Sequence, residues 1–593
     1  DFGLTFWMKE NMTLKAETHI AAFTVEDIRK NKDNKHTELI PKIARDSYQF
    51  MAALTQTKLN EGDLLNLSMT IDSPKLILAM DYLFALKSFL DTAINVKPSA
   101  KISDVPENQN KIDSKLSEDE HREPSKTKFQ YCVNVVDSSI ILLADPSDTN
   151  SEAVVFSAGQ LLLADQNILS ASANNVGMFL CRMETFNENR VRLLDDFSSS
   201  IVIDGRNSTP EKLLTSVQFA IEPLVMRLSL RDIRLAIFIV NRVMALAKEN
   251  GLVEDTPSET MDINTKYGAF SKEFKKTLSK YAPSVISSLS ELSNKRSAPT
   301  NEPETILRAE KLHADIEGLR LVLIGDIHEL PILDMNIKPF SVSAKDWSSE
   351  IDAVASLETY ANIFNYSRSS WEPLVESFPI SFHLSKGSGQ DASLVFDVIS
   401  RKVAEITLSS RSIALLSQIQ NSLYDDTGLK PRGAEKPYKI YNDTGLDLNV
   451  WIASKEAKDK RGLTTLKNGE VLPWEFEDWR KVRDSLDTDN SQSILGVQVV
   501  GSKYKTTLEI DVTSEGEEVY MLKPAKNEVH NRLACELKLC EDNVKLITLR
   551  STLLLENTTS TTVQFKMNTN DPITYDIRPG DSRSVPIEEA YSS

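Results

Sequence analysis

The sequence predicts a mainly β protein in which antiparallel strands alternate with a few helices and end in a tandem β-module. Segments in which apolar and polar residues strictly alternate dominate the chain, and this period of two is typical of half-buried strands. In addition, a β-turn followed by such a strand occurs twice near the C-terminus. Two similar elements in the same order indicate a repeated module rather than one enzyme core.

The alternating segments define the strands that we expect. They lie at 65–71, 129–135, 217–221, 380–384, 394–398 and 404–408. Gly387-Ser388-Gly389 supplies a hairpin turn between two of them. Because several strands occur for each helix and hairpin turns join them, antiparallel sheet is favoured over a parallel βαβ arrangement.

Three helices interrupt the strands. Ser73 can cap a helix that has Pro74 at its first position and runs over 74–94. Ser229 can cap a second helix over 230–248, and a shorter helix is expected at 410–423. We expect the first helix to cover the sheet rather than to anchor a membrane.

Length and composition limit the possible classes of protein. A chain of 593 residues has room for roughly four domains. It starts without Met and runs straight into an alternating segment, so we expect a piece of a longer protein. An apolar fraction of 41% supports packed cores but is low for a membrane protein. The longest apolar stretch, at 235–247, contains Asn241 and Arg242 and is too short to span a bilayer.

The net charge limits the possible partners of the protein, and the cysteine count indicates its compartment. A net charge of -18 disfavours nucleic acid, because phosphate binding requires clustered cations. It also disfavours broad adhesion to anionic lipid, so we expect membranes to be contacted only peripherally. Four cysteines do not form a disulfide framework in a chain of this length, which indicates a reducing, cytoplasmic location.

Two segments differ from the rest in composition. Residues 97–127 are rich in charge, Ser and Pro, which predicts a disordered linker, and 294–303 is similar but shorter. Between them, 262–292 reads as a helical insert with aromatic residues on one side and lysines elsewhere. It is either a membrane-surface helix or a helix packed on the sheet with solvated lysines.

No catalytic or metal-binding pattern emerges from the sequence. Dinucleotide, P-loop, zinc-protease and serine-hydrolase motifs are absent, and the seven His are scattered. Cys535 and Cys540 are an odd number of residues apart, so on one strand they would point to opposite faces. We therefore expect neither an enzyme, nor a metal site, nor a cofactor.

The repeated C-terminal unit combines a turn, a strand and a later Gly-containing turn. The first copy has Asn442-Asp443-Thr444-Gly445, then Leu448, Val450 and Ile452, and later Gly469 before Leu472-Pro473-Trp474. The second has Asn557-Thr558-Thr559, then Val563, Phe565 and Met567, and later Gly580 before Val585-Pro586-Ile587. The chain ends soon afterwards, so the second copy is expected to be truncated.

Several of these segments resemble a known family. Phe364-Asn365-Tyr366 with Trp371-Glu372-Pro373-Leu374-Val375-Glu376, the run from Tyr438 to Trp451, and Leu472-Pro473-Trp474-Glu475-Phe476 are similar to motifs of vacuolar protein sorting protein thirteen, a bridge-like lipid transfer protein. Ile71-Asp72-Ser73-Pro74 and Glu222-Pro223-Leu224 resemble strand-to-helix steps of its groove units. The resemblance covers most of the chain and is strongest from Asn365 onward.

The resemblance implies an elongated antiparallel β-groove of repeating units with crossover helices, followed by adaptor-binding β-sandwich repeats. The division that it implies is a groove unit at 1–96, a linker at 97–127, a groove unit at 128–250, a helical insert and linker at 251–311, a groove unit at 312–436, a repeat at 437–548 and a truncated repeat at 549–593. Asn442 and Asn557 match the family's characteristic Asn and are the candidate adaptor-binding residues. The family's repeats that contact adaptor peptides come later and lie outside this chain. The alternative for Asn442 is that its side chain holds its own turn.

The function implied is transfer of glycerophospholipid along the groove at organelle membrane contact sites, with phospholipids and adaptor proteins carrying short peptide motifs as partners. The candidate lipid-lining residues are Leu65, Leu67, Met69, Phe129, Tyr131, Val133, Val217, Phe219, Ile221, Ile406 and Leu408. An alternating strand can equally bury its apolar side on a second sheet, so these residues are either lipid lining or ordinary protein core. The alternative function is accordingly a non-catalytic scaffold whose β-modules bind adaptor peptides.

Overall fold

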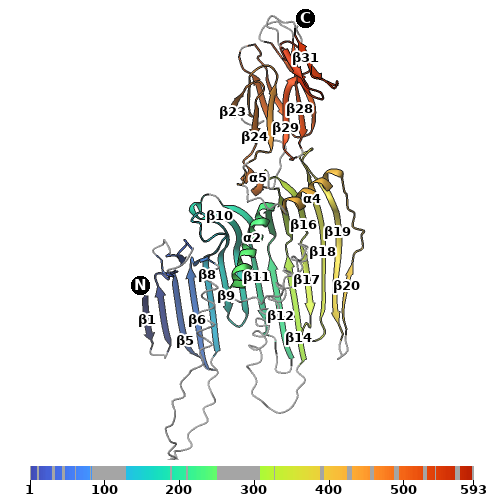
Figure 1. Ribbon diagram of the computed structural model, residues 1–593. Coiled ribbons are helices and arrows are strands. Elements are labelled where there is room, and N and C mark those ends of the chain that lie inside the picture. Colours follow the sequence, from blue (N-terminus) through green and yellow to red (C-terminus); the bar gives the residue numbers. More distant parts are fainter. Residues whose placement is uncertain are drawn as a thin grey trace, which may run out of the picture.

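The protein consists of one large curved sheet and a smaller β-sandwich module joined end to end (Figure 1). The computed structural model describes residues 2–9, 13–29, 34–42, 47–59, 62–79, 82, 128–186, 188, 190–206, 208, 212–249, 307–325, 328–387, 393–423, 431–433, 435–453, 460–485, 493–501, 503–524, 530–540, 542–567 and 574–590. The expected linker at 97–127 and the helical insert at 262–292 lie outside the described residues. The large sheet is called the groove module below.

In the described residues, the groove module is a sheet of 18 strands. Its strands are β1 (Phe2–Met8), β2 (Leu14–Ile20), β5 (Phe50–Leu59), β6 (Gly62–Asp72), β7 (Lys75–Leu78), β8 (Lys128–Leu143), β9 (Glu152–Asp165), β10 (Leu169–Arg182), β11 (Val191–Asp204), β12 (Lys212–Ile221), β13 (Leu224–Ser229), β14 (Leu307–Ile316), β15 (Leu319–Ile324), β16 (Pro331–Ile337), β17 (Phe340–Lys345), β18 (Asp352–Asn365), β19 (Ser370–Lys386) and β20 (Leu394–Ile399). A small separate pair, β3 (Val25–Glu26) and β4 (Glu38–Ile40), lies between β2 and β5 in the sequence.

Neighbouring strands of the sheet are mostly antiparallel, as expected, and the antiparallel pairing of β19 with β20 is confirmed. Ser388 and Gly389 of the turn expected between them lie outside the described residues. Four pairings are parallel: β6 with β8, β7 with β8, β12 with β14, and β13 with β15. In each case a long connection brings the chain back before the next strand, and such crossovers produce parallel neighbours. Strand β14 begins at Leu307, before the boundary at 312 that was expected for the third groove unit.

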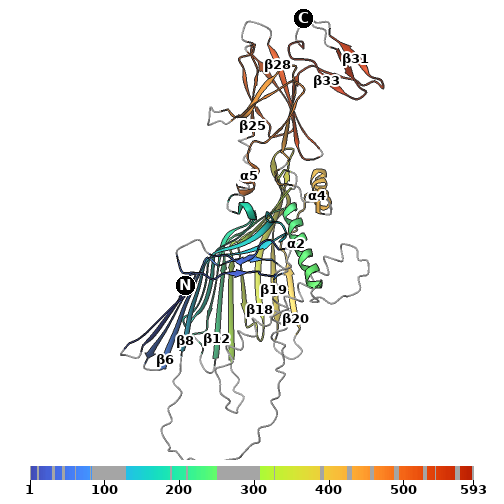
Figure 2. The same cartoon turned by 60° about the vertical axis from the view of Figure 1, so that its left-hand side comes forward.

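The described residues contain two of the three expected helices. Helix α2 (Leu230–Glu249) begins with reciprocal hydrogen bonds, because the Ser229 hydroxyl accepts from the Asp232 N–H and the Asp232 carboxylate accepts from the Ser229 N–H. Helix α4 (Ser410–Leu423) is capped by Ser409, whose hydroxyl accepts from the Ser412 N–H. Figure 2 shows both helices on the same side of the sheet.

Two predictions from local pattern are wrong. The segment after Ser73 does not start a helix: Ser73 has φ of 49° and residues 75–78 form β7, which pairs with β8. Pairing with a strand far away in sequence overrides the local capping signal here, and residues 83–94 lie outside the described part. The segment 404–408 is not a strand either, since only an isolated bridge joins Ile406 to Val375.

A line of backbone irregularities crosses the groove module. Ser73, Asp137, Gly159 and Asn175 occupy one row of neighbouring strands, and the three non-glycine members have φ values of 49°, 48° and 52°. The line separates two parts of the sheet that differ in burial. In the part that contains Val154 and Val155, these two neighbouring residues are both buried. Val154 packs against α2 on one face of the sheet, and Val155 packs against Phe179, Met183 and Phe186 on the other. Both faces of the sheet are therefore covered at this end.

The β-sandwich module packs a five-stranded sheet on a four-stranded one. Its elements are β21 (Tyr438–Asp443), β22 (Leu448–Ala453), β23 (Arg461–Leu466), β24 (Val471–Trp474), α5 (Trp479–Ser485), β25 (Ile494–Val499), β26 (Thr507–Asp511), β27 (Gly516–Leu522), β28 (Asn531–Leu539) and β29 (Lys545–Ser551). The predicted strand that carries Leu448, Val450 and Ile452 is confirmed as β22. The second unit contributes β30 (Leu554–Glu556), β31 (Val563–Lys566), β32 (Thr574–Ile577) and β33 (Ser582–Ser584).

Candidate functional site

One face of the groove module is apolar from edge to edge. Cross-strand partners in a sheet point to the same face, so the pairing register shows which side chains form a row. One such row runs through Leu4, Thr18, Ala52, Met69, Val133, Leu163, Ala171, Ile201, Phe219, Ala314, Val342, Ala355, Phe382 and Val398. Every member except Thr18 is apolar. The row crosses strands from β1 at one edge to β20 at the other.

The opposite face has a different composition. The residues next to that row in each strand form a second row: Thr5, Glu17, Ala53, Ser68, Cys132, Ala164, Ser170, Val202, Gln218, His313, Ser343, Val354, His383 and Asp397. Polar and small side chains dominate it. The sheet is therefore amphipathic across its whole width, and we call the side with the first row the apolar face.

Within the described residues, no protein layer covers the apolar face. Leu4 is 63% exposed, Phe129 50% and Phe396 60%. The buried hydrophobic clusters formed by the described residues contain no member of the first row. A monomeric protein rarely exposes so large a contiguous apolar surface without a ligand or partner for it.

The structure brings most of the predicted lining residues together on the apolar face. Leu65, Leu67 and Met69 pair directly with Phe129, Tyr131 and Val133. Val217, Phe219 and Ile221 lie on the same face, opposite Ile203, Ile201 and Ser199 of β11. Ile406 and Leu408 do not join this surface as strand residues, because their segment forms no strand. Both are exposed in the connection between β20 and α4.

Other members of the apolar face were not predicted from the sequence. Ala171, Ala314, Ala344 and Ala355 form parts of its floor, and Ala344 pairs with Ala353. Alanine carries little hydrophobic signal, so alternation is hard to recognise where it fills the apolar positions. The strong alternation of β1, with Phe2, Leu4, Phe6 and Met8, was the available signal at the N-terminal edge.

The chemistry of the apolar face suits hydrocarbon and offers little to a polar substrate. Its rows carry aliphatic and aromatic side chains, and Phe382 stacks on Phe396 with ring centroids 6.2 Å apart. Burial, with a smaller effect of the Asp165 carboxylate, raises the pKa of Tyr131, so its hydroxyl is neutral at physiological pH. In the described ranges, no group of three or more His, Cys, Asp or Glu is placed to hold a metal ion.

In the sandwich module, Asn442 is fully buried and its side chain is saturated with hydrogen bonds. Its amide donates to the carbonyls of Leu446 and Leu466 at 2.8 and 3.0 Å. Its Oδ1 accepts from the N–H and the hydroxyl of Thr444 at 3.1 and 2.7 Å. Asn442 thereby holds the turn after β21 in place and is not accessible to a partner.

Asn557 reproduces this arrangement in the second unit. Its amide donates to the carbonyls of Thr561 and Ile577 at 2.8 and 2.7 Å, and its Oδ1 accepts from the N–H and hydroxyl of Thr559 at 3.0 and 2.7 Å. Asn557 is 4% exposed. The two units are thus repeats in atomic detail, and each Asn acts on its own turn.

The fold and the apolar face define a class of protein: a long amphipathic β-groove with an uncovered apolar side, joined to a module of β-sandwich repeats. Comparison with known proteins agrees with this class. The family sequence model described as the VPS13-like family middle region matches residues 8–497, and that of the vacuolar-sorting associated protein 13 adaptor binding domain matches residues 478–593. The chain belongs to the VPS13 family.

Two curated relatives illustrate the similarity. The chain is 34% identical over 98% of its length to the intermembrane lipid transfer protein VPS13 of Chaetomium thermophilum, and it covers 20% of that protein. It is 20% identical over 44% of its length to the mouse intermembrane lipid transfer protein VPS13C, and it covers 8% of that protein. The chain therefore spans a fifth or less of the length of these relatives. Among the described residues, no helix has the length and apolarity to cross a bilayer.

Proposed function

We propose that the groove module conducts glycerophospholipids between apposed membranes, with their acyl chains lying on the apolar face. The observation that carries this proposal is the row from Leu4 to Val398, which is apolar at every position except Thr18 and crosses the sheet with no described protein layer against it. The lining comprises the rows through Leu65, Leu67 and Met69, through Phe129, Tyr131 and Val133, and through Val217, Phe219 and Ile221. Both curated relatives are named as intermembrane lipid transfer proteins.

Energetics explain why an open apolar face is useful for this task. Transfer of a methylene group to water costs about 0.8 kcal/mol, so a two-chain lipid with roughly thirty of them faces a barrier on the order of 24 kcal/mol. A continuous apolar surface replaces most of this contact with water. The polar head group stays hydrated at the open side of the groove, where its desolvation cost is avoided. Movement along such a lining requires no catalytic residue.

The sandwich repeats serve targeting in this proposal. They take part in recruitment of the protein to organelle membrane contact sites by adaptor proteins with short peptide motifs, and the protein stays cytoplasmic and peripheral to the membrane. Support comes from the match of residues 478–593 to the adaptor-binding domain. Asn442 and Asn557 contribute indirectly, because each fixes the turn that shapes the surface of its repeat.

Lipid co-purification tests the groove. The chain is purified, extracted with organic solvent, and its phospholipid is quantified per mole of protein by mass spectrometry. We expect phospholipid in the unmodified chain and a severalfold loss in Phe219→Asp, which places a charge in the middle of the apolar face. The matched control is Gln218→Asp, one residue away on the opposite face.

The outcomes separate the two functions considered for this chain. Lipid retained by Gln218→Asp and lost by Phe219→Asp supports conduction along the apolar face. An unmodified chain that is folded but free of phospholipid favours a scaffold, in which the repeats bind peptides and the groove carries no cargo. Equal loss in both variants contradicts a role for one particular face.

A further inference from the structure

Helix α5 of the β-sandwich module contacts the groove module. This helix lies in the connection between β24 and β25, and Figure 1 shows it below the sandwich strands and beside the ends of the groove strands. Its Arg483 side chain is only 1% exposed. An arginine at that depth requires partners, because an unpaired buried charge is very unfavourable.

The partners of Arg483 come from the groove module. Arg483 Nη2 lies 2.6 Å from an Asp232 carboxylate oxygen, and Arg483 Nη1 lies 3.0 Å from Glu329 Oε2. Arg483 Nη2 also donates to the carbonyl of Arg227 at 2.9 Å. Asp232 belongs to the first turn of α2, and Glu329 to the connection between β15 and β16.

A second arginine completes the group. Arg432, from the segment that links the two modules, lies 2.5 Å from Asp232 and 3.8 Å from Glu329. Two guanidinium groups therefore balance two carboxylates, and all four side chains are at most 11% exposed. Burial raises the pKa of Glu329, but the positive charges of Arg483 and Arg432 oppose this shift. We call Asp232, Glu329, Arg432 and Arg483 the charge quartet.

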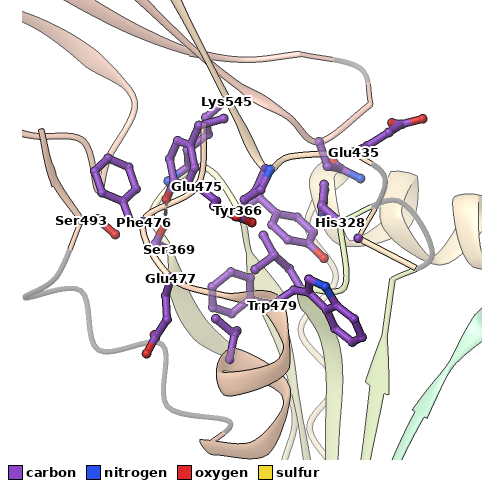
Figure 3. A pocket seen from close by; sticks show the side chains of 17 residues that line it. His328, Tyr366, Ser369, Glu435, Glu475, Phe476, Glu477, Trp479, Ser493 and Lys545 are labelled. Carbon is purple, nitrogen blue, oxygen red and sulfur yellow. Dashed lines mark hydrogen bonds between the residues drawn. The ribbon is translucent and has the colours of Figure 1, made fainter. Parts of the chain in front are cut away.

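Other contacts between the modules are both apolar and polar. Leu539 of β28 packs against the groove-side cluster that contains Tyr366 and Leu415. The Glu515 carboxylate accepts from the Ser367 hydroxyl at 2.6 Å and pairs with Arg411 at 2.7 Å. A cavity of about 100 Å³ lies between the modules, and Figure 3 shows that both line it, with His328 and Tyr366 from the groove side and Trp479 from α5. The interface between the modules therefore combines the buried charges of the quartet with polar and apolar contacts, and it leaves this cavity unfilled.

We propose that the charge quartet is a latch that holds the β-sandwich module in one orientation on the groove module. Its consequence for targeting rests on the proposed function: a partner that binds the sandwich would then also orient the groove. Asp232 has a dual role, because it caps α2 as well as binding Arg483. The start of that helix is thus tied to the position of the sandwich.

The test uses the whole chain with two latch variants and one control. Arg483→Met leaves two carboxylates facing one guanidinium, whereas the double variant Arg483→Met with Glu329→Gln restores charge balance. Lys481→Met makes the same type of change at an exposed position of the same helix. Hydrogen–deuterium exchange of the peptide that contains α5 reports the latch, and small-angle scattering reports the spread of module orientations.

We expect at least tenfold faster exchange at α5 and a broader scattering profile for Arg483→Met, partial restoration in the double variant, and unmodified behaviour in Lys481→Met. Unchanged exchange and scattering in Arg483→Met would overturn the proposal. So would a double variant as loose as the single one, since apolar contacts would then be responsible. Phospholipid content is measured on the same samples, so failure of the groove as a lipid carrier is recognised separately from failure of the latch.

Discussion

The two modules contain strands with the same alternation of apolar and polar residues, but the apolar side is buried in one module and exposed in the other. In the sandwich, Leu448 and Val450 alternate with polar residues and are completely buried, because the five-stranded sheet covers them. In the groove, Phe396 and Val398 flank the polar Asp397 in the same way, yet they are 60% and 55% exposed. The difference lies in what the chain places opposite each sheet and is absent from the local sequence.

This comparison separates residues that contribute to stability from residues that are free to contact a ligand. A residue buried between two sheets contributes to folding through the area that it removes from water. A residue on an uncovered face contributes little to folding and is available to a ligand. Substitutions of the same chemical kind should therefore have separate effects in the two modules, on unfolding in one and on lipid content in the other.

The largest expected effect comes from placing a charge in each module. Val450→Asp buries a carboxylate without a partner in the sandwich core and should lower the free energy of unfolding of that module by about 4 kcal/mol or more. Phe219→Asp on the apolar face should lower the free energy of unfolding of the groove by about 1 kcal/mol or less. Chemical denaturation followed by circular dichroism measures both. A similar loss in both modules would show that the apolar face is covered in solution.

A medium effect is expected from the buried turn of the first repeat. Asn442→Ala removes four hydrogen bonds and leaves the carbonyls of Leu446 and Leu466 buried without that donor, which should destabilise the sandwich by about 3 kcal/mol. Asn449→Ala is the control, because that side chain bonds only the exposed Thr465 hydroxyl among the contacts described. Its effect should stay below about 0.5 kcal/mol. Equal effects of the two substitutions would contradict a structural role for Asn442.

The strands, two helices and the repeated turns could be predicted from the sequence because their signals are local. Ser229 with Asp232 and Ser409 with Ser412 are capping pairs a few residues apart, and both helices start where these pairs predict. Ser73 failed as a cap because the chain beyond it pairs with β8, more than fifty residues away. Parallel pairings were missed for the same reason, since they depend on where long connections return.

The candidate site was predictable only in part. Alternation identified Leu65, Phe129 and Phe219 as members of one face, but whether a face is covered depends on distant segments. Ile406 carries the same alternation and forms no strand, because one bridge to Val375 is its only ladder contact in the described structure. The charge quartet had no sequence signal at all, since its four members come from separate parts of the chain.

The smallest expected effect concerns the boundary between the modules. Lys545 is 4% exposed, and its ammonium bonds the Ser369 hydroxyl and the Thr513 carbonyl. Burial lowers the pKa of Lys545 to about 8 from an unfolded value near 10.5. Between these values the unfolded chain binds more protons than the folded one, so this group makes stability rise with pH. Below pH 8 both states are protonated and the penalty for burying the charge is fully present.

From pH 8 to pH 10 the unmodified chain should therefore gain about 2 kcal/mol of stability relative to Lys545→Met, in which the titrating group is absent. Denaturation of both proteins at matched ionic strength measures the difference. Parallel stability curves would mean that Lys545 is hydrated in solution, as expected if the sandwich moves away from the turn that carries Ser369. A rising difference would instead show that the two modules keep this lysine enclosed, which extends burial from the sandwich core to the boundary with the groove while the apolar face stays open.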